Sequence, residues 1–130
     1  MSPDRPRFPR QQPLLDAESR AKLPALYSQE EKGLDALAPI KFFTPDSNWT
    51  WYASEGSSIE ANRYRDAAEG GTDFLMFGLV SGFEVELGYF SLAELEEARG
   101  PMGLPIERDV HYAAKTLREL MDLHRRGEVG

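Results

Sequence analysis

The feature that most constrains the fold of this chain is a pair of neighbouring apolar segments with different patterns. Residues 74–80 (FLMFGLV) are apolar throughout, whereas residues 83–90 (FEVELGYF) alternate. A continuous apolar run is typical of a strand buried on both faces, and alternation is typical of a strand with one solvent-exposed face. Because only Ser81 and Gly82 separate the two segments, we predict an antiparallel β-hairpin. Its second strand would turn Phe83, Val85, Leu87 and Tyr89 to the core and Glu84 and Glu86 to the opposite face.

An earlier hairpin is also predicted. Residues 40–43 (IKFF) and 49–53 (WTWYA) are rich in aromatic side chains, and residues 44–48 (TPDSN) between them favour a turn. Alternation along the second of these strands places Trp49, Trp51 and Ala53 on one face. Residues 106–112 (IERDVHY) predict a last strand.

The segment between the hairpins, residues 55–73, is rich in glycine, serine and charge. We expect a long excursion there, with one or two helical turns at residues 62–69, because a structureless loop of this length is unusual in a compact domain. Residues 1–13 contain four prolines interleaved with three arginines, a pattern typical of an extended, disordered tail. The expected domain organisation is therefore an Arg/Pro-rich tail at 1–13 and a single domain at 14–130.

Helix starts are predicted from residues that cap the first turn. The three clearest caps are Asp16 before residues 17–23, Ser91 with Glu94, and Thr116 with Glu119. The last of these begins an amphipathic helix in which Leu117, Leu120, Met121 and His124 share one side. Ser28 with Glu31 fits the same pattern, but Gly33 weakens the helix that would follow.

These elements predict an α+β domain with a mostly antiparallel sheet of four to five strands and helices packed on one face. A chain of 130 residues suits one hydrophobic core. It has no cysteine, so packing must stabilise it rather than disulfides or thiolate-bound metal. No run approaches the roughly 20 apolar residues of a membrane span, and the start shows no signal sequence, so we expect a cytoplasmic protein.

The chain is acidic, with 22 Asp and Glu against 15 Lys and Arg, which gives a net charge of −7. Residues 1–13 carry +2, so residues 14–130 carry −7 − 2 = −9. Such a charge disfavours general attraction to nucleic-acid phosphates. It keeps a small protein soluble, and it also allows the protein to compete for a basic nucleic-acid channel in a partner protein.

Two groups of residues could support chemistry at a sheet face. Glu107, Asp109 and His111 alternate on the predicted last strand, where they could offer oxygen and nitrogen ligands to a divalent metal. Glu84 and Glu86 would lie about 7 Å apart, a separation that suits an acid and a base. A solvent-facing strand has the same alternation, and no phosphate loop, metalloprotease motif or nucleophile motif accompanies either group. We therefore predict no metal and no cofactor.

Trp49 and Trp51 could form a platform on which a nucleic-acid base or a peptide stacks. Aromatic residues on strands usually belong to the core. A binding role becomes the better explanation if both indoles lie on a face that no helix covers.

Seven motifs carry a resemblance to a known family. They are residues 23–31 (LPALYSQEE), 41–52 (KFFTPDSNWTWY), 78–80 (GLV), 82–84 (GFE), 86–92 (ELGYFSL), 99–101 (RGP) and 103–109 (GLPIERD). In this order they resemble the bacterial family called domain of unknown function 2958, over about residues 14–123. The resemblance implies a gene carried on a plasmid, phage or integrative element, often among genes for DNA processing or anti-restriction. It brings no established catalytic residues.

The polar and aromatic residues of these motifs are our candidates for a shared binding site, although they could equally fix turns and strands. They are Asp46, Asn48, Trp49, Trp51, Glu84, Glu86, Arg99, Glu107, Arg108 and Asp109. The favoured hypothesis is a non-enzymatic accessory protein of a mobile element that binds a host or element-encoded protein. The partner would be a DNA-handling protein or a defence nuclease, which this chain would inhibit as an acidic anti-restriction or anti-CRISPR protein.

Two alternatives stay open. One is a small metal- or ligand-dependent enzyme that uses carboxylates on one sheet face, and its acidic side chains would have to converge on a common cleft. The other is a single-stranded nucleic-acid-binding module built on Trp49 and Trp51, which the negative charge of the chain disfavours.

Overall fold

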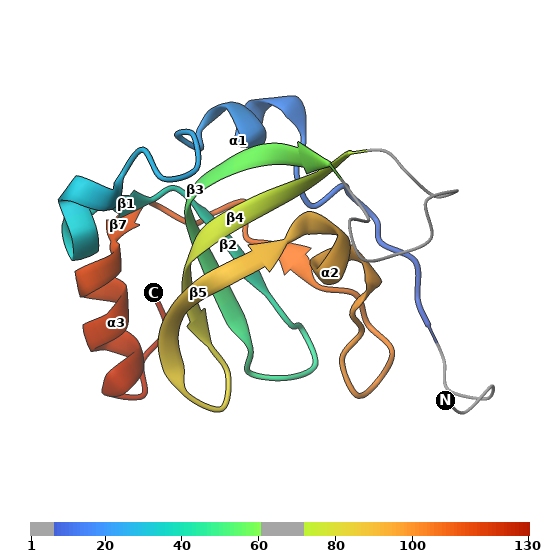
Figure 1. The fold of residues 1–130 in the computed structure, drawn as a ribbon. Helices are drawn as coiled ribbons and strands as arrows, with labels where there is room; N and C mark the ends of the chain where they lie inside the picture. The colour runs from blue at the N-terminus through green and yellow to red at the C-terminus, as the bar shows by residue number, and fades with distance from the viewer. Residues whose placement is uncertain (1–6, 61–71) are drawn as a thin grey trace.

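The computed structural model describes residues 7–60 and 72–130, which form two antiparallel sheets and four helical segments (Figure 1). The strands are β1 (Leu37–Ala38), β2 (Ile40–Phe43), β3 (Thr50–Glu60), β4 (Thr72–Ser81), β5 (Val85–Ser91), β6 (Glu107–Arg108) and β7 (Lys115–Thr116). The helical segments are α1 (Ala17–Ala21), the 3-10 helix η1 (Glu30–Asp35), α2 (Leu92–Glu97) and α3 (Leu117–Arg125). The larger sheet has the order β5-β4-β3-β2-β6, and the smaller one pairs β1 with β7. The predicted α+β class and antiparallel sheet are confirmed.

The large sheet is covered on both faces, so the prediction that helices pack on one face is wrong. Phe74 and Met76 of β4 join one core with Leu95 of α2. Leu79 of the same strand joins a second core with Leu117 of α3. The apolar run of β4 explains the difference, because a strand that is apolar on both faces must be covered on both.

Both predicted hairpins are present, but β3 and β4 are longer than predicted. β2 pairs with β3, and β4 pairs with β5, in antiparallel register. β3 continues to Glu60, which lies opposite Thr72, so residues 55–60 extend a strand instead of opening a long excursion. A bulge between Ala53 and Glu55 shifts the register within β3. The helical turns predicted at residues 62–69 lie outside the described residues.

Three of the four predicted helix caps are confirmed. Each of these caps, Asp16, Ser91 and Thr116, accepts a hydrogen bond from the backbone amide three residues later. The cap predicted at Ser28 is wrong, because η1 begins after Gln29 and Ser28 donates its hydroxyl to the Ala25 carbonyl. Gly33, at φ +52°, interrupts η1 as its conformational freedom allows. No helix in the part of the chain that the structure describes is long and apolar enough to cross a membrane.

The last predicted strand is much shorter than residues 106–112. Glu107 and Arg108 pair with β2, at the sheet edge opposite to β5, and the Asp109 amide adds one more hydrogen bond, to the Lys41 carbonyl at 2.9 Å. The chain then turns, and the His111 amide donates to the Asp109 carboxylate at 2.9 Å. Glu107, Asp109 and His111 therefore do not share one strand face. Within residues 7–60 and 72–130, no group of three or more His, Asp or Glu side chains could hold a metal ion.

Strand β5 and the turn before it are less buried than the alternating pattern predicts. Phe83 is 94% exposed, Leu87 is 40% exposed and Tyr89 is 53% exposed, so the prediction that these side chains face the core is wrong. Val85 packs, half-buried, against the second core. These side chains are exposed because β5 is an edge strand, and the helices that pack on the sheet leave part of its apolar face open.

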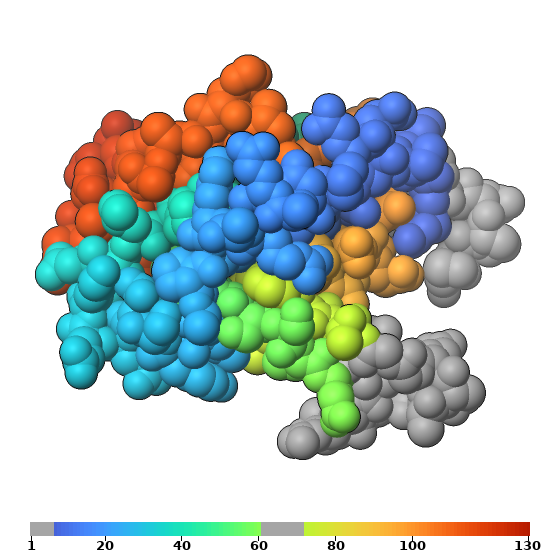
Figure 2. All heavy atoms as spheres, turned by 90° about the horizontal axis from the view of Figure 1, so that it is seen from above, coloured from blue at the N-terminus to red at the C-terminus, as the bar shows by residue number. Residues whose placement is uncertain are grey.

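The N-terminal residues cover one side of the molecule. Seen from above in Figure 2, residues 7–36 (blue to cyan) lie between β3 (green) and the C-terminal residues (orange). Phe8 donates its amide to the Gly103 carbonyl at 2.9 Å, and Arg10 donates Nε to the Ile106 carbonyl at 3.1 Å. Residues 7–13 of the expected tail therefore contact the loop after α2, and residues 1–6 lie outside the described residues.

Candidate protein-binding surface

The candidate residues do not gather in one place. Glu84 and Glu86 lie at the start of β5, whereas Glu107 and Asp109 lie at and after β6, and these strands are opposite edges of the sheet. The predicted carboxylates therefore do not meet in a common cleft, as an enzyme built on them would require.

The candidates at β6 attach distant segments to the sheet. Arg108 donates to the Leu14 carbonyl at 2.9 Å and to the Ser19 hydroxyl at 3.1 Å. Asp109 pairs with Lys41 at 3.4 Å, and Lys41 is only 8% exposed. Both side chains are thus engaged within the chain, and their place in the GLPIERD motif has a structural explanation.

Asp46 and Arg99 shape the loop after α2. The Asp46 carboxylate accepts a hydrogen bond from the Met102 amide at 2.8 Å. Arg99 donates to the Glu96 carbonyl at 2.9 Å. Gly100 lies so close to Asp46 that a Cβ atom there would stand 1.7 Å from the carboxylate. A side chain at this position would push the Asp46 carboxylate away from the Met102 amide. Two other candidates, Asn48 and Glu107, are exposed.

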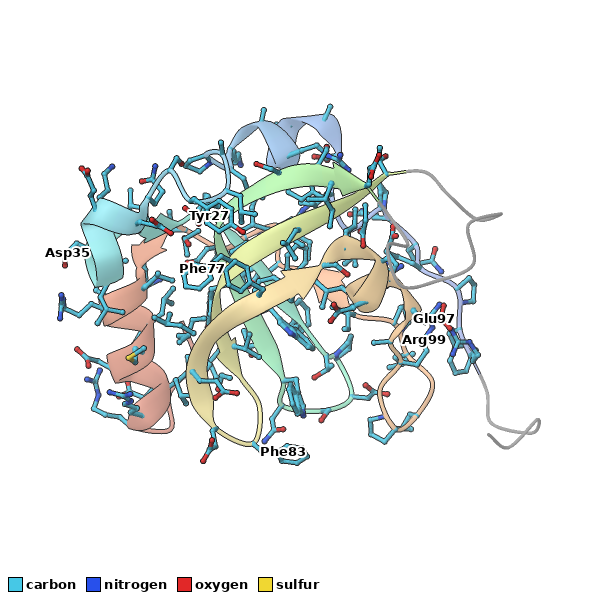
Figure 3. All side chains as sticks on the ribbon, viewed as in Figure 1. Tyr27, Asp35, Phe77, Phe83, Glu97 and Arg99 are labelled. Atoms are coloured by element: carbon cyan, nitrogen blue, oxygen red, sulfur yellow. The ribbon has the colours of Figure 1, made fainter. Side chains whose placement is uncertain are left out.

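The remaining candidates form an aromatic and acidic surface at the end of the β4–β5 hairpin. The Trp49 ring stacks on Trp51 at 5.9 Å between centroids and meets Phe83 edge-on at 5.2 Å. Trp51 packs against the first core, whereas Phe83 lies exposed at the tip of the hairpin (Figure 3). Glu84 and Glu86 are exposed and line the same hollow as Trp49 and Phe83. We call Trp49, Phe83, Glu84 and Glu86 the hairpin patch.

The turn of this hairpin fixes the position of Trp49. The Gly82 amide donates to the Glu84 carbonyl at 3.0 Å and closes the turn. A Cβ atom on Gly82 would stand 2.3 Å from the Trp49 ring, so the indole packs directly on the turn backbone. The patch is therefore organised before any partner arrives, which lowers the entropy lost on binding.

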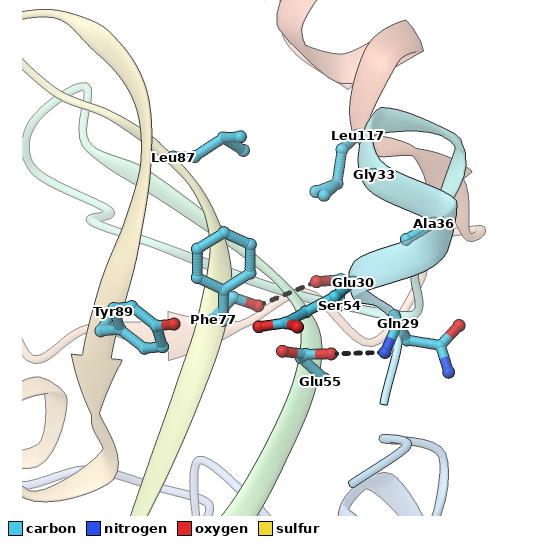
Figure 4. Close-up of a pocket in the computed structure, with 10 residues that line it drawn as sticks. All are labelled: Gln29, Glu30, Gly33, Ala36, Ser54, Glu55, Phe77, Leu87, Tyr89 and Leu117. Atoms are coloured by element: carbon cyan, nitrogen blue, oxygen red, sulfur yellow. Dashed lines mark hydrogen bonds between the residues drawn. The ribbon is translucent and has the colours of Figure 1, made fainter. Parts of the chain in front are cut away.

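A second feature, which the sequence did not predict, lies on the opposite face of β5. It is a largely apolar cavity of about 190 Å³ between the sheet and η1 (Figure 4). Phe77, Leu87 and Tyr89 form its wall on the side of the sheet. The lining is completed by Gln29, Glu30, Gly33, Ala36, Ser54, Glu55 and Leu117. We call this cavity the β5 pocket.

Glu55 is a buried carboxylate that organises one side of the β5 pocket. It is 3% exposed, and its two oxygens accept hydrogen bonds from the amides of Tyr27 (2.8 Å) and Gln29 (2.9 Å). Tyr27 adopts φ +71°, in the left-handed region that is rare for a bulky residue. Its ring lies edge-on to Tyr89 at 6.3 Å between centroids. No local sequence pattern predicts these contacts, because they join segments that only the complete fold brings together.

The charge in the β5 pocket is acidic. Partial loss of solvent around the Tyr89 hydroxyl raises its pKa above the ordinary value of 10.0, and Tyr27, Glu30 and Glu55 raise it further. Tyr89 is therefore neutral at physiological pH. The lining residues include two carboxylates, Glu30 and Glu55, and no lysine or arginine.

One protein family matches most of the chain. Residues 14–128 match the family model described as "Protein of unknown function (DUF2958)". The chain belongs to this family. In this DUF2958 chain, the hairpin patch and the β5 pocket both lie inside the matched region. No curated protein and no solved structure matches the chain.

The two features of the DUF2958 chain lie on opposite faces of one edge strand. Trp49, Trp51, Glu84 and Glu86 were predicted from the sequence, whereas the β5 pocket was not. An exposed Phe83 and a half-buried Trp49 beside carboxylates suit the recognition of a cationic and partly apolar surface. The hairpin patch therefore has the chemistry to contact a partner with such a surface.

Proposed function

We propose that this protein is a non-enzymatic accessory protein of a plasmid, phage or integrative element and works in the cytoplasm by binding another protein. The partner would be a host or element-encoded protein that handles DNA, such as a defence nuclease. The hairpin patch carries the proposal, because Phe83 is 94% exposed beside Trp49 and two carboxylates. Aromatic side chains exposed in a cluster are typical of contact surfaces.

Charge supports a partner with a basic surface. Residues 14–130 carry −7 − 2 = −9, and Glu84 and Glu86 place part of this charge beside the exposed aromatic rings. A basic nucleic-acid channel attracts such a surface through the same field that attracts phosphate. The protein would inhibit its partner by occupying that channel, in an anti-restriction or anti-CRISPR role. Its binding would weaken as salt rises.

The same charges disfavour the nucleic-acid alternative. Trp49 lies beside Glu84 and Glu86, whose carboxylates repel phosphate groups. Trp51 packs against the core and offers less surface for stacking. We expect no change in tryptophan fluorescence when single-stranded DNA is added at low salt.

The test is an affinity pull-down from lysates of a host that carries the parent element, at low and at high salt, with mass spectrometry of the retained proteins. The informative variant is Glu84→Lys/Glu86→Lys. The matched control is Glu18→Lys/Glu96→Lys, which changes the net charge equally at exposed positions outside the hairpin patch.

We expect the wild type and the control to retain a DNA-handling protein at low salt, and the Glu84→Lys/Glu86→Lys variant to lose it. Retention that responds neither to salt nor to the reversal at the hairpin patch would contradict the proposal. So would the absence of any DNA-handling protein among those retained.

A further inference from the structure

We propose that the partner presents an extended segment with basic and apolar side chains in a fixed order, and that this segment pairs with the outer edge of β5. The inference rests on the proposed protein-binding function and specifies the chemistry of the partner. Three observations carry it: the edge position of β5, the β5 pocket on one face, and the carboxylates of the hairpin patch on the other.

The first observation is that β5 is the last strand on its side of the sheet. Figure 1 shows β5 along the outer side of β4, with which it pairs from Val85 to Ser91. The outer edge of such a strand presents backbone N–H and C=O groups that can pair with an added strand. At its centre, a Cβ atom on Gly88 would meet no atom within 4 Å, so the sheet face above this residue is open, on the same side as Glu86.

The second observation is the space beside the apolar face of β5. Leu87 and Tyr89 point to the face on which the β5 pocket opens. Its volume of about 190 Å³ exceeds the roughly 150 Å³ of a cavity that admits benzene. An added strand would therefore place apolar side chains opposite Leu87 and Tyr89, with one of them entering the pocket.

The third observation is the charge on the other face. Glu86 alternates with Leu87, so its side chain points away from the β5 pocket, to the face on which the rest of the hairpin patch lies. Opposite charges on facing residues of adjacent strands stabilise the pair. Lysine or arginine opposite Glu84 and Glu86 would also lie near the Phe83 and Trp49 rings, where cations bind favourably.

The same carboxylates disfavour a second copy of this chain as the occupant. Pairing of two β5 edges about a two-fold axis beside Glu86 would bring Glu84 and Glu86 of each copy towards those of the other. Like charges on facing strands destabilise the pair, and charged edges are a common protection against self-association. The geometry thus favours a basic segment over the strand's own copy.

The test uses two fluorescent hexapeptides, Lys-Thr-Lys-Val-Thr-Val and its reverse. The first places its lysines opposite Glu84 and Glu86 and its valines opposite Leu87 and Tyr89 when it pairs parallel to β5, and the second does so when it pairs antiparallel. Binding is followed by fluorescence anisotropy at low salt. Each peptide is also made in two N-methylated forms, one methylated on the odd-numbered amides and one on the even-numbered amides. A peptide of the same composition in a scrambled order is a further control. The protein variants are Glu86→Lys and Tyr89→Lys, with Glu96→Lys as the control, and urea unfolding checks that each variant keeps its fold.

We expect one of the two peptide orders to bind. In that peptide, one of the two N-methylated sets should weaken the affinity at least about tenfold, because these N-methyl groups remove the backbone N–H donors that pair with β5. Glu86→Lys and Tyr89→Lys should weaken it to a similar degree, while Glu96→Lys should not. If both N-methylated sets bind as well as the parent peptide, charge attraction without strand pairing is the explanation and the inference is wrong. It is equally wrong if neither order binds, or if sedimentation shows a stable dimer through β5 that excludes the peptide.

These outcomes separate the inference from the function on which it rests. A partner whose retention depends on Glu84 and Glu86, together with peptides that do not bind, would keep the protein-binding function and remove strand pairing. Failure of both experiments would remove both.

Discussion

Tyr52 connects three parts of the chain through one hydroxyl group. The Gly130 amide donates to this oxygen at 3.1 Å, and Nε2 of His124 lies 2.6 Å from it. The hydroxyl and Nε2 share one hydrogen bond, and which of them donates is set by which ring nitrogen of His124 carries the hydrogen. Burial lowers the pKa of His124 below its ordinary value of 6.5, so the imidazole is neutral at physiological pH.

The first residue-scale prediction concerns this hydroxyl. Tyr52→Phe leaves the Gly130 amide and the His124 ring without their partner, and we expect a loss of about 1–3 kcal/mol in the free energy of unfolding. Urea unfolding measures the loss. The control is Tyr89→Phe, an exposed tyrosine for which we expect a change within about 0.5 kcal/mol. Equal effects of the two substitutions would contradict the prediction.

Alkaline pH should destabilise the protein through its buried phenols. Burial raises the pKa of Tyr52 from 10.0 to about 12, and it also raises the pKa of Tyr112. The unfolded chain therefore loses these protons first, so the stabilisation is complete below pH 10 and disappears as pH rises towards 12. Urea unfolding across this range should show the decline. The fall of the unfolding free energy with pH should be less steep in Tyr52→Phe. An unchanged steepness would contradict the raised pKa of Tyr52.

Asp109 tests whether a motif residue is structural. Asp109→Ala deprives the buried Lys41 of its ion-pair partner, and we expect a cost of about 1–3 kcal/mol. Adding Lys41→Met to this variant should recover part of the loss, since it removes the unpaired charge. Denaturant titration of the single and double variants gives the answer. A neutral Asp109→Ala would instead return Asp109 to the list of binding candidates.

At the scale of elements, two glycines that face each other across β4 and β5 have opposite roles. A Cβ atom on Gly78 would stand 1.7 Å from the Tyr52 carbonyl oxygen of β3, whereas one on Gly88 would meet nothing within 4 Å. We expect Gly78→Ala to cost at least about 3 kcal/mol, because it forces β3 and β4 apart, and Gly88→Ala to stay within about 0.5 kcal/mol. Thermal unfolding of both variants compares them, and similar melting temperatures would be incompatible with the β3–β4 register.

Elements with local signals could be predicted from the sequence, and the others could not. Asp16, Ser91 and Thr116 cap the helices that follow them because capping needs only the next turn of chain. β1 and β7 have two residues each, and neither has a pattern before the other is present. Phe83 and Leu87 were assigned to the core because alternation shows which residues share a face, but it does not show what covers that face.

The candidate site divides in the same way. The hairpin patch lies around one turn, so Trp49, Glu84 and Glu86 could be singled out from their motifs. The β5 pocket could not, because its lining comes from the N-terminal segment, three strands and α3. Glu55 illustrates the difficulty. In the sequence it opens the predicted excursion at residues 55–73, and in the fold it accepts hydrogen bonds from two amides of a distant segment.

At the scale of the whole molecule, the acidic residues beside β5 should keep the protein monomeric. Replacing Glu84 and Glu86 with threonine removes the repulsion between two β5 edges and leaves the core intact. We expect sedimentation velocity to show self-association that rises with concentration. Glu18→Thr/Glu96→Thr, with the same change in net charge, should remain monomeric. Self-association of both variants would point to a general effect of charge.

The way β6 and β7 complete the two sheets has a consequence for synthesis of the chain. The β3–β4 and β4–β5 pairs join neighbours along the chain, whereas β6 joins β2 and β7 joins β1. Contacts between distant segments form late, because closing the long loop between them costs more chain entropy. While the chain emerges from the ribosome, β1 and β2 must therefore wait for residues 107–116. During that interval the nascent sheet has a second unpaired edge, and this is when a chaperone would protect it most.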